Sequence, residues 1–161
     1  MTKPRPNLSV EDLWSLERIG QPALSPDGLQ AVCSVTRGSM DSNSASTQLW
    51  LLPSRPGKTR PPRQLTACGD KDGQPAWATA GAPRIAFLAR REQEGVKDAS
   101  SQLYVISLEG GEAQRISNFA PGIESFKWLA DGRRIVFAAW VWPELKGAAA
   151  QARRYKEFSE R

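Results

Sequence analysis

Short apolar segments recur along this chain in a fixed order, separated by turn residues. The first segment, Pro22–Leu24, ends in Ser-Pro-Asp-Gly at residues 25–28, and a second segment, Leu29–Val35, follows at once. Proline favours the second position of a β-turn, and Asp-Gly supplies residues that tolerate a positive φ. The pattern therefore predicts an antiparallel hairpin.

The same hairpin pattern occurs twice more. In the second copy, the apolar segments 74–77 and 84–89 flank a longer Gly/Pro turn, Ala78-Thr-Ala-Gly-Ala-Pro83. In the third copy, segments 125–129 and 133–141 flank Ala-Asp-Gly. We expect each copy to form the first two strands of a repeated unit.

A second pattern follows the first two hairpins only. Gln-Leu-Trp-Leu-Leu at 48–52 returns 54 residues later as Gln-Leu-Tyr-Val-Ile at 102–106, and each is followed by a Gly-containing turn and a short strand, 63–66 or 113–117. Self-similarity at this period is typical of propellers and solenoids, and four antiparallel strands form one propeller blade. We therefore predict an all-β fold: an incomplete β-propeller of about two and a half four-stranded antiparallel blades, with a short N-terminal helix and a C-terminal helix.

An ordinary β-sandwich with coincidentally similar hairpins is the alternative. The correspondence of Trp77 with Trp128, and of Leu65 with Ile116, holds in both halves of the unit and favours the propeller. The predicted organisation is an N-terminal extension and helix at 1–20, blade 1 at 21–67, blade 2 at 68–118, the first half of blade 3 at 119–143, and a helical insertion at 144–161, after which the chain is truncated.

Helix signals lie at both ends of the chain. Ser9 can cap a helix that Asp12 completes as a capping box, with Leu8 and Leu13 placed for a hydrophobic staple. We expect this helix to run to about Ile19, to end at Gly20, and to pack on the body as a latch; binding a partner is the alternative.

The predicted C-terminal helix and loops depend on spacing and composition. Apolar residues at helical spacing predict the C-terminal helix from Glu144 to Arg161. They are Leu145, Ala148, Ala149, Ala152 and Tyr155. The polar or Pro-rich stretches 37–47, 53–62 and 90–101 are expected to be surface loops.

Net charge is +5, from 22 Lys and Arg against 17 Asp and Glu. The basic residues are scattered between a Pro-rich loop and the terminal helix. They are Arg55, Lys58, Arg60, Arg63, Arg153, Arg154 and Lys156. No recognition module accompanies this charge, so a solvated basic surface is favoured over nucleic-acid binding. An independent small β-protein that binds nucleic acid remains a lesser hypothesis.

Cysteines and apolar runs indicate the compartment. Cys33 lies among valines and is expected to be a small buried residue, while nothing demands a disulfide with Cys68. Residues 1–6 lack the apolar stretch of a secretory signal, and the longest apolar run, Ile135–Trp142, is too short to span a bilayer. The expectation is a soluble cytoplasmic protein without a membrane partner.

Catalytic chemistry is missing from the sequence itself. The chain contains no histidine and no G-x-S-x-G motif, which excludes a Ser-His-Asp triad within it. Gly110-Gly111 is expected to be a hairpin turn and not a phosphate cradle, and residues 70–73 lack the glutamate that a calcium loop requires. We predict no catalytic, cofactor-binding or metal-binding residue.

Six tryptophans could in principle stack on ligands: Trp14, Trp50, Trp77, Trp128, Trp140 and Trp142. Trp77 and Trp128 hold one repeat position, which favours packing between neighbouring blades. Trp140 and Trp142 share one face of the expected strand, so core or interface packing is favoured over ligand contact.

The repeated Ser-Pro-Asp-Gly unit resembles TolB-type propeller repeats. More specifically, three segments together resemble the N-terminal propeller of prolyl oligopeptidase-family serine peptidases, most closely the acylaminoacyl-peptidase-like and dipeptidyl-peptidase-like branches. They are Ser-Val-Glu-Asp-Leu-Trp-Ser-Leu at 9–16, Gln-Pro-Ala-Leu-Ser-Pro-Asp-Gly at 21–28, and Gln-Leu-Trp-Leu-Leu-Pro at 48–53. Trp-Val-Trp-Pro at 140–143, followed by a charged helix, strengthens the likeness.

This resemblance implies a propeller that restricts an α/β-hydrolase domain to short peptides. The hydrolase would carry a serine, an acid and a histidine, and no position here matches any of them. The implied partners are the remaining blades and that hydrolase domain, with peptides as substrates of the parent family and no cofactor. A TolB-like scaffold for protein binding is the alternative, and self-association through open strand edges is expected of an incomplete ring.

Overall fold

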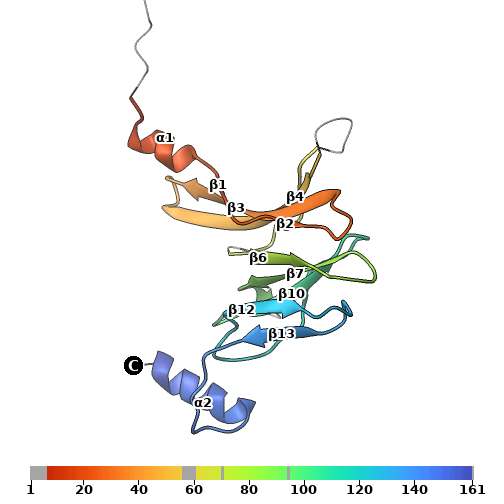
Figure 1. Ribbon diagram of the computed structural model, residues 1–161. Coiled ribbons are helices and arrows are strands. Elements are labelled where there is room, and N and C mark those ends of the chain that lie inside the picture. Colours follow the sequence, from red (N-terminus) through yellow and green to blue (C-terminus); the bar gives the residue numbers. More distant parts are fainter. Residues whose placement is uncertain (1–6, 56–60, 70, 94, 161) are drawn as a thin grey trace, which may run out of the picture.

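The computed structural model describes residues 7–55, 61–69, 71–93 and 95–160. Three β-units are stacked in it, from top to bottom in Figure 1. The elements in chain order are α1 (Val10–Ser15), β1 (Arg18–Ile19), β2 (Ala23–Leu24), β3 (Gln30–Ser39), β4 (Ser44–Pro53), β5 (Arg63–Gln64), β6 (Gly73–Trp77), β7 (Arg84–Ala89), β8 (Glu92–Gln93), β9 (Val96–Lys97), β10 (Gln102–Ser107), β11 (Gln114–Arg115), β12 (Ser125–Trp128), β13 (Ile135–Ala138) and α2 (Ala148–Ser159).

Sheet 1 contains β1 to β5. Its order is β1-β3-β4-β5, and β2 also pairs with β3. Because β4 occupies one edge of β3 along its whole length, β1 and β2 share the other edge as one interrupted strand. Arg18 lies opposite Thr36 and Ala23 opposite Val32. The sheet is thus an antiparallel ladder with four strand positions, the first of which is broken in two.

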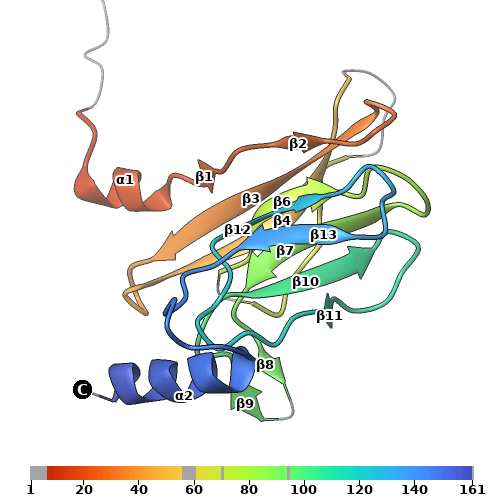
Figure 2. The same cartoon turned by 60° about the horizontal axis from the view of Figure 1, so that its bottom comes forward.

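Sheets 2 and 3 repeat this order. Sheet 2 runs β6-β7-β10-β11, and sheet 3 consists of β12 and β13. Trp77 pairs with Ile85 in sheet 2, and Trp128 pairs with Ile135 in sheet 3. The predicted all-β, incomplete propeller is confirmed, since the sheets are antiparallel and the described strands close no ring (Figure 2).

The turns that join the first two strands are alike in the first and third units. Gly28 N donates to Ser25 O at 2.9 Å, and Gly132 N donates to Leu129 O at 3.0 Å. Both glycines have positive φ values, 69° and 61°, which a residue with a Cβ adopts only with strain. The Asp-Gly pairs therefore fix the hairpins as the sequence predicts.

Each pair of neighbouring sheets encloses an apolar core. Between sheets 1 and 2 the buried residues are Val32, Leu49, Leu51, Trp77, Ile85, Phe87, Ala89, Tyr104 and Ile106. Between sheets 2 and 3 they are Ala86, Leu88, Leu103 and Ile123, with Phe126, Trp128 and Ile135 packed against them. Side chains alternate across each strand, so sheet 2 packs on both neighbours at once.

The N-terminal helix is shorter than expected. It has the predicted capping box, since Asp12 N donates to Ser9 Oγ at 3.1 Å and Ser9 N donates to the Asp12 carboxylate at 2.9 Å. The extension to Ile19 is wrong, because the backbone becomes extended at Leu16 and residues 18–19 join β3. The free edge of a ten-residue strand competes successfully with a helix that buries no residue.

Two predicted loops contain strands. β3 and β4 continue through most of residues 37–47 and leave only a turn at 40–43, because the long hairpin pairs without interruption. Residues 90–101 contain the β8–β9 hairpin. Polar composition concealed these strands, since most of their described side chains are exposed.

The C-terminal segment differs from the prediction in three respects. α2 begins at Ala148 and not at Glu144, because Gly147 has a φ of 86° and Leu145 lies in a preceding turn. β13 ends at Ala138, so the expected strand to residue 141 is too long. Trp140 is 79% exposed, and its predicted packing in a core or interface is wrong.

Some predictions fall outside the described residues. These concern residues 1–6, Lys58, Arg60, Asp70 and Arg161. Cys33 is buried as predicted, Cys68 is exposed, and both are free thiols. Among the described helices, none is long and apolar enough to cross a membrane.

Candidate functional site: the packing faces between sheets

An indole joins each sheet to the one before it. Trp77 Nε1 donates to Ala23 O at 2.9 Å, and Trp128 Nε1 donates to Ala76 O at 3.1 Å. Donor and acceptor both lie on the first strands of their sheets. The predicted role of Trp77 and Trp128 in packing between blades is therefore confirmed, with a hydrogen bond added to the apolar contact.

A hydroxyl group holds the fourth strand of each complete sheet. Leu49 N donates to Thr66 Oγ1 at 2.9 Å, and Leu103 N donates to Ser117 Oγ at 2.8 Å. The next backbone bonds also match, since the amides of residues 65 and 116 donate to the carbonyls of residues 49 and 103. This geometry explains the correspondence of Leu65 with Ile116 in the sequence.

An arginine lies over an aromatic ring of the third strand in both sheets. Arg91 sits 5.4 Å from the Tyr104 ring and binds Asp72 with a 2.6 Å ion pair that is almost wholly buried. Arg37 sits 4.9 Å from the Trp50 ring and binds Glu17 at 2.6 Å on the surface.

Sequence reasoning missed this arrangement. The available signal was the 54-residue spacing of Arg37 and Arg91, which is also the spacing of the two aromatic residues. The Asp72 carboxylate, in the segment 70–73 that was compared with a calcium loop, forms its ion pair with Arg91. Each charge of the buried pair thus has its partner. The Asp72 amide also donates to Thr47 O at 3.0 Å, which joins this end of sheet 2 to sheet 1.

A second carboxylate closes the same end of sheet 2. Asp98 accepts a 2.6 Å hydrogen bond from the Tyr104 hydroxyl and a 3.0 Å ion pair from Arg115. The aspartate is buried, so the tyrosine and arginine provide the partners that a buried carboxylate requires. Among the described residues, Asp72 and Asp98 at this end are both paired with an arginine, and these pairs link neighbouring elements.

The described residues provide little for covalent chemistry. Burial raises the pKa of the Cys33 thiol, which keeps it protonated and unreactive at neutral pH. The sequence predicts no catalytic residue in this chain. The surfaces of interest are therefore the faces through which one sheet packs on the next.

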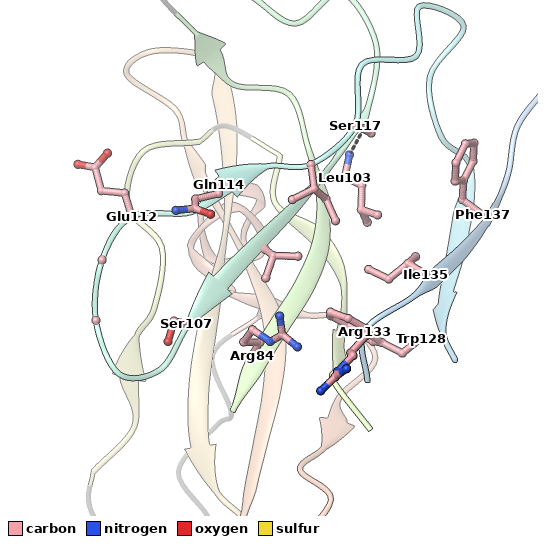
Figure 3. A pocket seen from close by; sticks show the side chains of 14 residues that line it. Arg84, Leu103, Ser107, Glu112, Gln114, Ser117, Trp128, Arg133, Ile135 and Phe137 are labelled. Atoms are coloured by element: carbon pink, nitrogen blue, oxygen red, sulfur yellow. Dashed lines mark hydrogen bonds between the residues drawn. The ribbon is translucent and has the colours of Figure 1, made fainter. Parts of the chain in front are cut away.

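One such surface is open. A groove of about 500 Å³ lies between β10–β11 of sheet 2 and the β12–β13 hairpin (Figure 3). We call it the inter-sheet groove; its lining residues are Arg84, Leu103, Val105, Ser107, Gly110, Gly111, Glu112, Gln114, Ile116, Ser117, Trp128, Arg133, Ile135 and Phe137. In Figure 3, Leu103 and Gln114 lie on one side, and Ile135 and Phe137 on the other.

The equivalent positions between sheets 1 and 2 are better covered. Leu51 is buried where its counterpart Val105 is half-buried, and Leu65 is half-buried where Ile116 is 50% exposed. A hollow of about 850 Å³ also remains between sheets 1 and 2 at their turn ends. The contrast in burial therefore marks the inter-sheet groove as an unfilled packing face.

Comparison with curated proteins gives relatives that are peptidases. The chain is 25% identical over 129 residues to an uncharacterized peptidase, YuxL, of Bacillus subtilis, covering 80% of this chain. It is 32% identical over 132 residues to dipeptidyl-peptidase 5 of Porphyromonas endodontalis, covering 82% of this chain. Each match spans 18% of the relative's length. No family model matches the chain.

Solved structures with the same fold are propellers of proteases. The propeller domain of the Trilobed protease from Pyrococcus furiosus superposes with a TM-score of 0.56 at 19% identity, covering 75% of this chain and 33% of that one. Acylaminoacyl peptidase of Pyrococcus horikoshii also gives a TM-score of 0.56, at 16% identity, covering 83% of this chain and 20% of that one. The chain is thus similar to the propeller part of these peptidases, and the matches do not extend over a catalytic domain.

Proposed function

We propose that this chain is the first part of a substrate-gating propeller that works together with further blades and an α/β-hydrolase domain in peptide hydrolysis. The chain itself does no chemistry. Its part is to form blades that limit which peptides reach a catalytic serine on another domain. We also propose the blade limits 21–67, 68–118 and 119–143. β1, at Arg18–Ile19, lies before the first of these ranges and pairs with β3 of sheet 1.

The observation that carries the proposal is the repeated packing geometry. The Trp77 and Trp128 indoles bind equivalent carbonyls of the preceding sheet, which sets successive sheets at the same relative position. A sheet so placed can be followed by another in the same way, and this is how a propeller ring is built. The relatives that share this segment are peptidases several times longer than the chain.

The ring would not require exchange of strands between its ends. All strands of sheet 1 come from one continuous stretch, Arg18–Gln64, so its outer edge is already filled by β5. The propeller domain of the Trilobed protease from Pyrococcus furiosus has an open velcro topology. We propose the same for the ring to which this chain contributes.

A non-enzymatic scaffold is the second candidate. The exposed apolar residues of α1 and of the segment after β13 favour it, because such residues are available to a protein partner. Blades downstream without a hydrolase domain would support this alternative.

The test is an assay of the polypeptide that contains this segment together with its downstream domains. We expect it to hydrolyse short chromogenic peptides, while residues 1–161 alone hydrolyse none. A matched protein that lacks residues 1–161 should cleave long and short peptides with less discrimination. The proposal fails if the intact polypeptide has no peptidase activity, or if deletion of the segment leaves size discrimination unchanged.

A further inference from the structure

Sheet 3 is equivalent to one half of sheet 2. β12 and β13 pair in the register of β6 and β7, and β7 then pairs along its other edge with β10, from Gln102 opposite Ala89 to Ser107 opposite Arg84. Among the described strands β13 pairs with β12 alone. The second edge of β13 therefore presents backbone donors and acceptors with no strand partner.

The inter-sheet groove continues an existing interface. Its floor is the face of sheet 2 that already packs against sheet 3, through Leu103 and its neighbours. The corresponding face of sheet 1 is covered over its outer half by apolar side chains of β10 and by residues beside β11. In the part of the chain that the structure describes, the outer half of the same face of sheet 2 has no such cover, which leaves Val105 and Ile116 partly exposed.

We propose that the inter-sheet groove receives a two-stranded β-hairpin that follows α2 in a longer polypeptide and completes sheet 3 as β10 and β11 complete sheet 2. This inference rests on the proposed function, because it takes the chain as a segment of a longer propeller. α2 is then an insertion between the second and third strands of one sheet.

The register dictates the chemistry of the hairpin's first strand. In sheet 2, Tyr104 lies opposite Phe87 and Ile106 lies opposite Ile85, and both point toward sheet 1. The same register places the third residue of the incoming strand opposite Phe137 and its fifth residue opposite Ile135. An aromatic residue at the third position and an aliphatic one at the fifth would fill the groove above Val105 and Ile116.

The second strand and the mouth of the groove add polar requirements. By the pattern of Thr66 and Ser117, the second strand carries a hydroxyl residue that accepts from an amide of the first. At the mouth, Arg84 Nη2 donates to Gly132 O at 2.8 Å, while its buried Nε has no hydrogen-bond partner among the described residues. A carbonyl of the hairpin's turn would satisfy this donor.

A fusion supplies a hairpin of known sequence. A second copy of residues 102–117 is joined after Arg161 through about 12 Gly and Ser residues, a linker with a typical reach of about 20 Å. Hydrogen exchange at the amides of Ile135–Ala138 is the readout, with and without the fusion. We expect the added strand to slow the exchange of the edge amides roughly tenfold.

Two matched controls isolate the groove. In the first, the appended copy alone has Asp at the positions of Tyr104 and Ile106, which retains a strand but removes its apolar face. In the second, Ile116→Glu in the main chain is compared with Val96→Glu on the β8–β9 hairpin. Both substituted side chains are at least half exposed, so both variants should fold, as circular dichroism will verify.

We expect the unsubstituted appended hairpin to slow exchange of the Ile135–Ala138 amides, and the Asp-bearing hairpin to leave it unchanged. Ile116→Glu in the main chain should abolish this slowing, whereas Val96→Glu should not. Equal exchange with the apolar and Asp-bearing hairpins overturns the proposal, as does protection that disappears on dilution, which would assign the groove to a second copy. Peptide hydrolysis is not measured in this experiment. A groove that accepts the hairpin, in a longer polypeptide that cleaves no peptide, would overturn the proposed function alone.

Discussion

The indoles of Trp77 and Trp128 each donate a hydrogen bond to a carbonyl of the preceding sheet, so the two residues can be tested as a pair. Trp77→Phe and Trp128→Phe each remove one hydrogen bond to a carbonyl of the preceding sheet and retain most of the apolar contact. We expect each to lower the free energy of unfolding by roughly 1–3 kcal/mol, because a partly buried carbonyl also loses its donor. Urea denaturation measures the change.

The control for both substitutions is Trp140→Phe, since that indole is largely exposed. It should leave the urea midpoint unchanged. If Trp140→Phe were as destabilising as the other two, the hydrogen bonds between sheets would not be the cause.

Asp131 gives a pH dependence with a defined sign. Backbone amides of Arg133 and Arg134 donate to its carboxylate and lower its pKa from 3.8 to about 2. A depressed pKa in the folded state contributes stability that is present above pH 3.8 and is lost as the pH falls through about 2. Asp131→Asn should therefore be less stable than the parent at pH 7, and the difference should shrink as the pH falls from 3.8 and vanish below about 2.

The measurement is the urea midpoint of parent and variant across this pH range. A difference between Asp131→Asn and the parent that persists undiminished at pH 2 would show that the carboxylate charge is not responsible.

Among the elements, the two arginine–aromatic pairs differ in their acidic partner and in the burial of that partner. Arg91 pairs with Asp72 under sheet 1, whereas Arg37 pairs with Glu17 at the surface. Arg91→Leu leaves a buried carboxylate without its cation and should cost roughly 3–5 kcal/mol. Arg37→Leu breaks an exposed pair and should cost at most about 1 kcal/mol.

Thermal or urea unfolding of the two variants gives this comparison directly. Similar losses for both would mean that sheet 1 does not bury the end of sheet 2. A greater loss of stability for Arg37→Leu than for Arg91→Leu would mean that the Arg37–Glu17 pair, and not the Arg91–Asp72 pair, is the buried one.

The elements that sequence reasoning could predict are those with turn chemistry or an alternating pattern of their own. Asp-Gly at 27–28 and 131–132 fixed two hairpins, and the capping box at Ser9 fixed the start of α1. β7 was predicted with its observed limits because its core residues are apolar without interruption. The indole position was also predictable, since Trp77 and Trp128 recur at one place in the repeat.

Features that depend on tertiary contact were not predictable. The strand at Arg18–Ile19 exists because β3 offers a free edge, and nothing local distinguishes it from a continuing helix. The partner of Arg91 is Asp72, 19 residues earlier and before the β6–β7 hairpin. A charged residue in a polar stretch does not indicate that it will be buried. The exposure of Trp140 follows from the early end of β13, which composition alone does not show.

At the scale of the whole molecule, the open faces have a consequence for solution behaviour. Among the described strands β13 has a free edge, and Val136 and Phe137 on it are about half exposed. Free strand edges with apolar side chains favour pairing with other chains. We expect residues 1–161 alone to self-associate in size-exclusion chromatography with light scattering.

Val136→Lys places a charge on this edge and should shift the chain toward monomer. Leu8→Lys, outside any strand, should not. A monodisperse monomer of the unsubstituted chain at every concentration tested would contradict the expectation.

Sheets 1, 2 and 3 follow one another through one repeated contact, in which an indole binds a carbonyl of the preceding sheet. A crystal structure of this polypeptide would examine this relation through the surroundings of the two indole nitrogens. We expect Trp77 Nε1 to lie at hydrogen-bonding distance from Ala23 O, and Trp128 Nε1 from Ala76 O. Indoles with unrelated neighbours, or sheets 2 and 3 packed in a different relation from sheets 1 and 2, would contradict it.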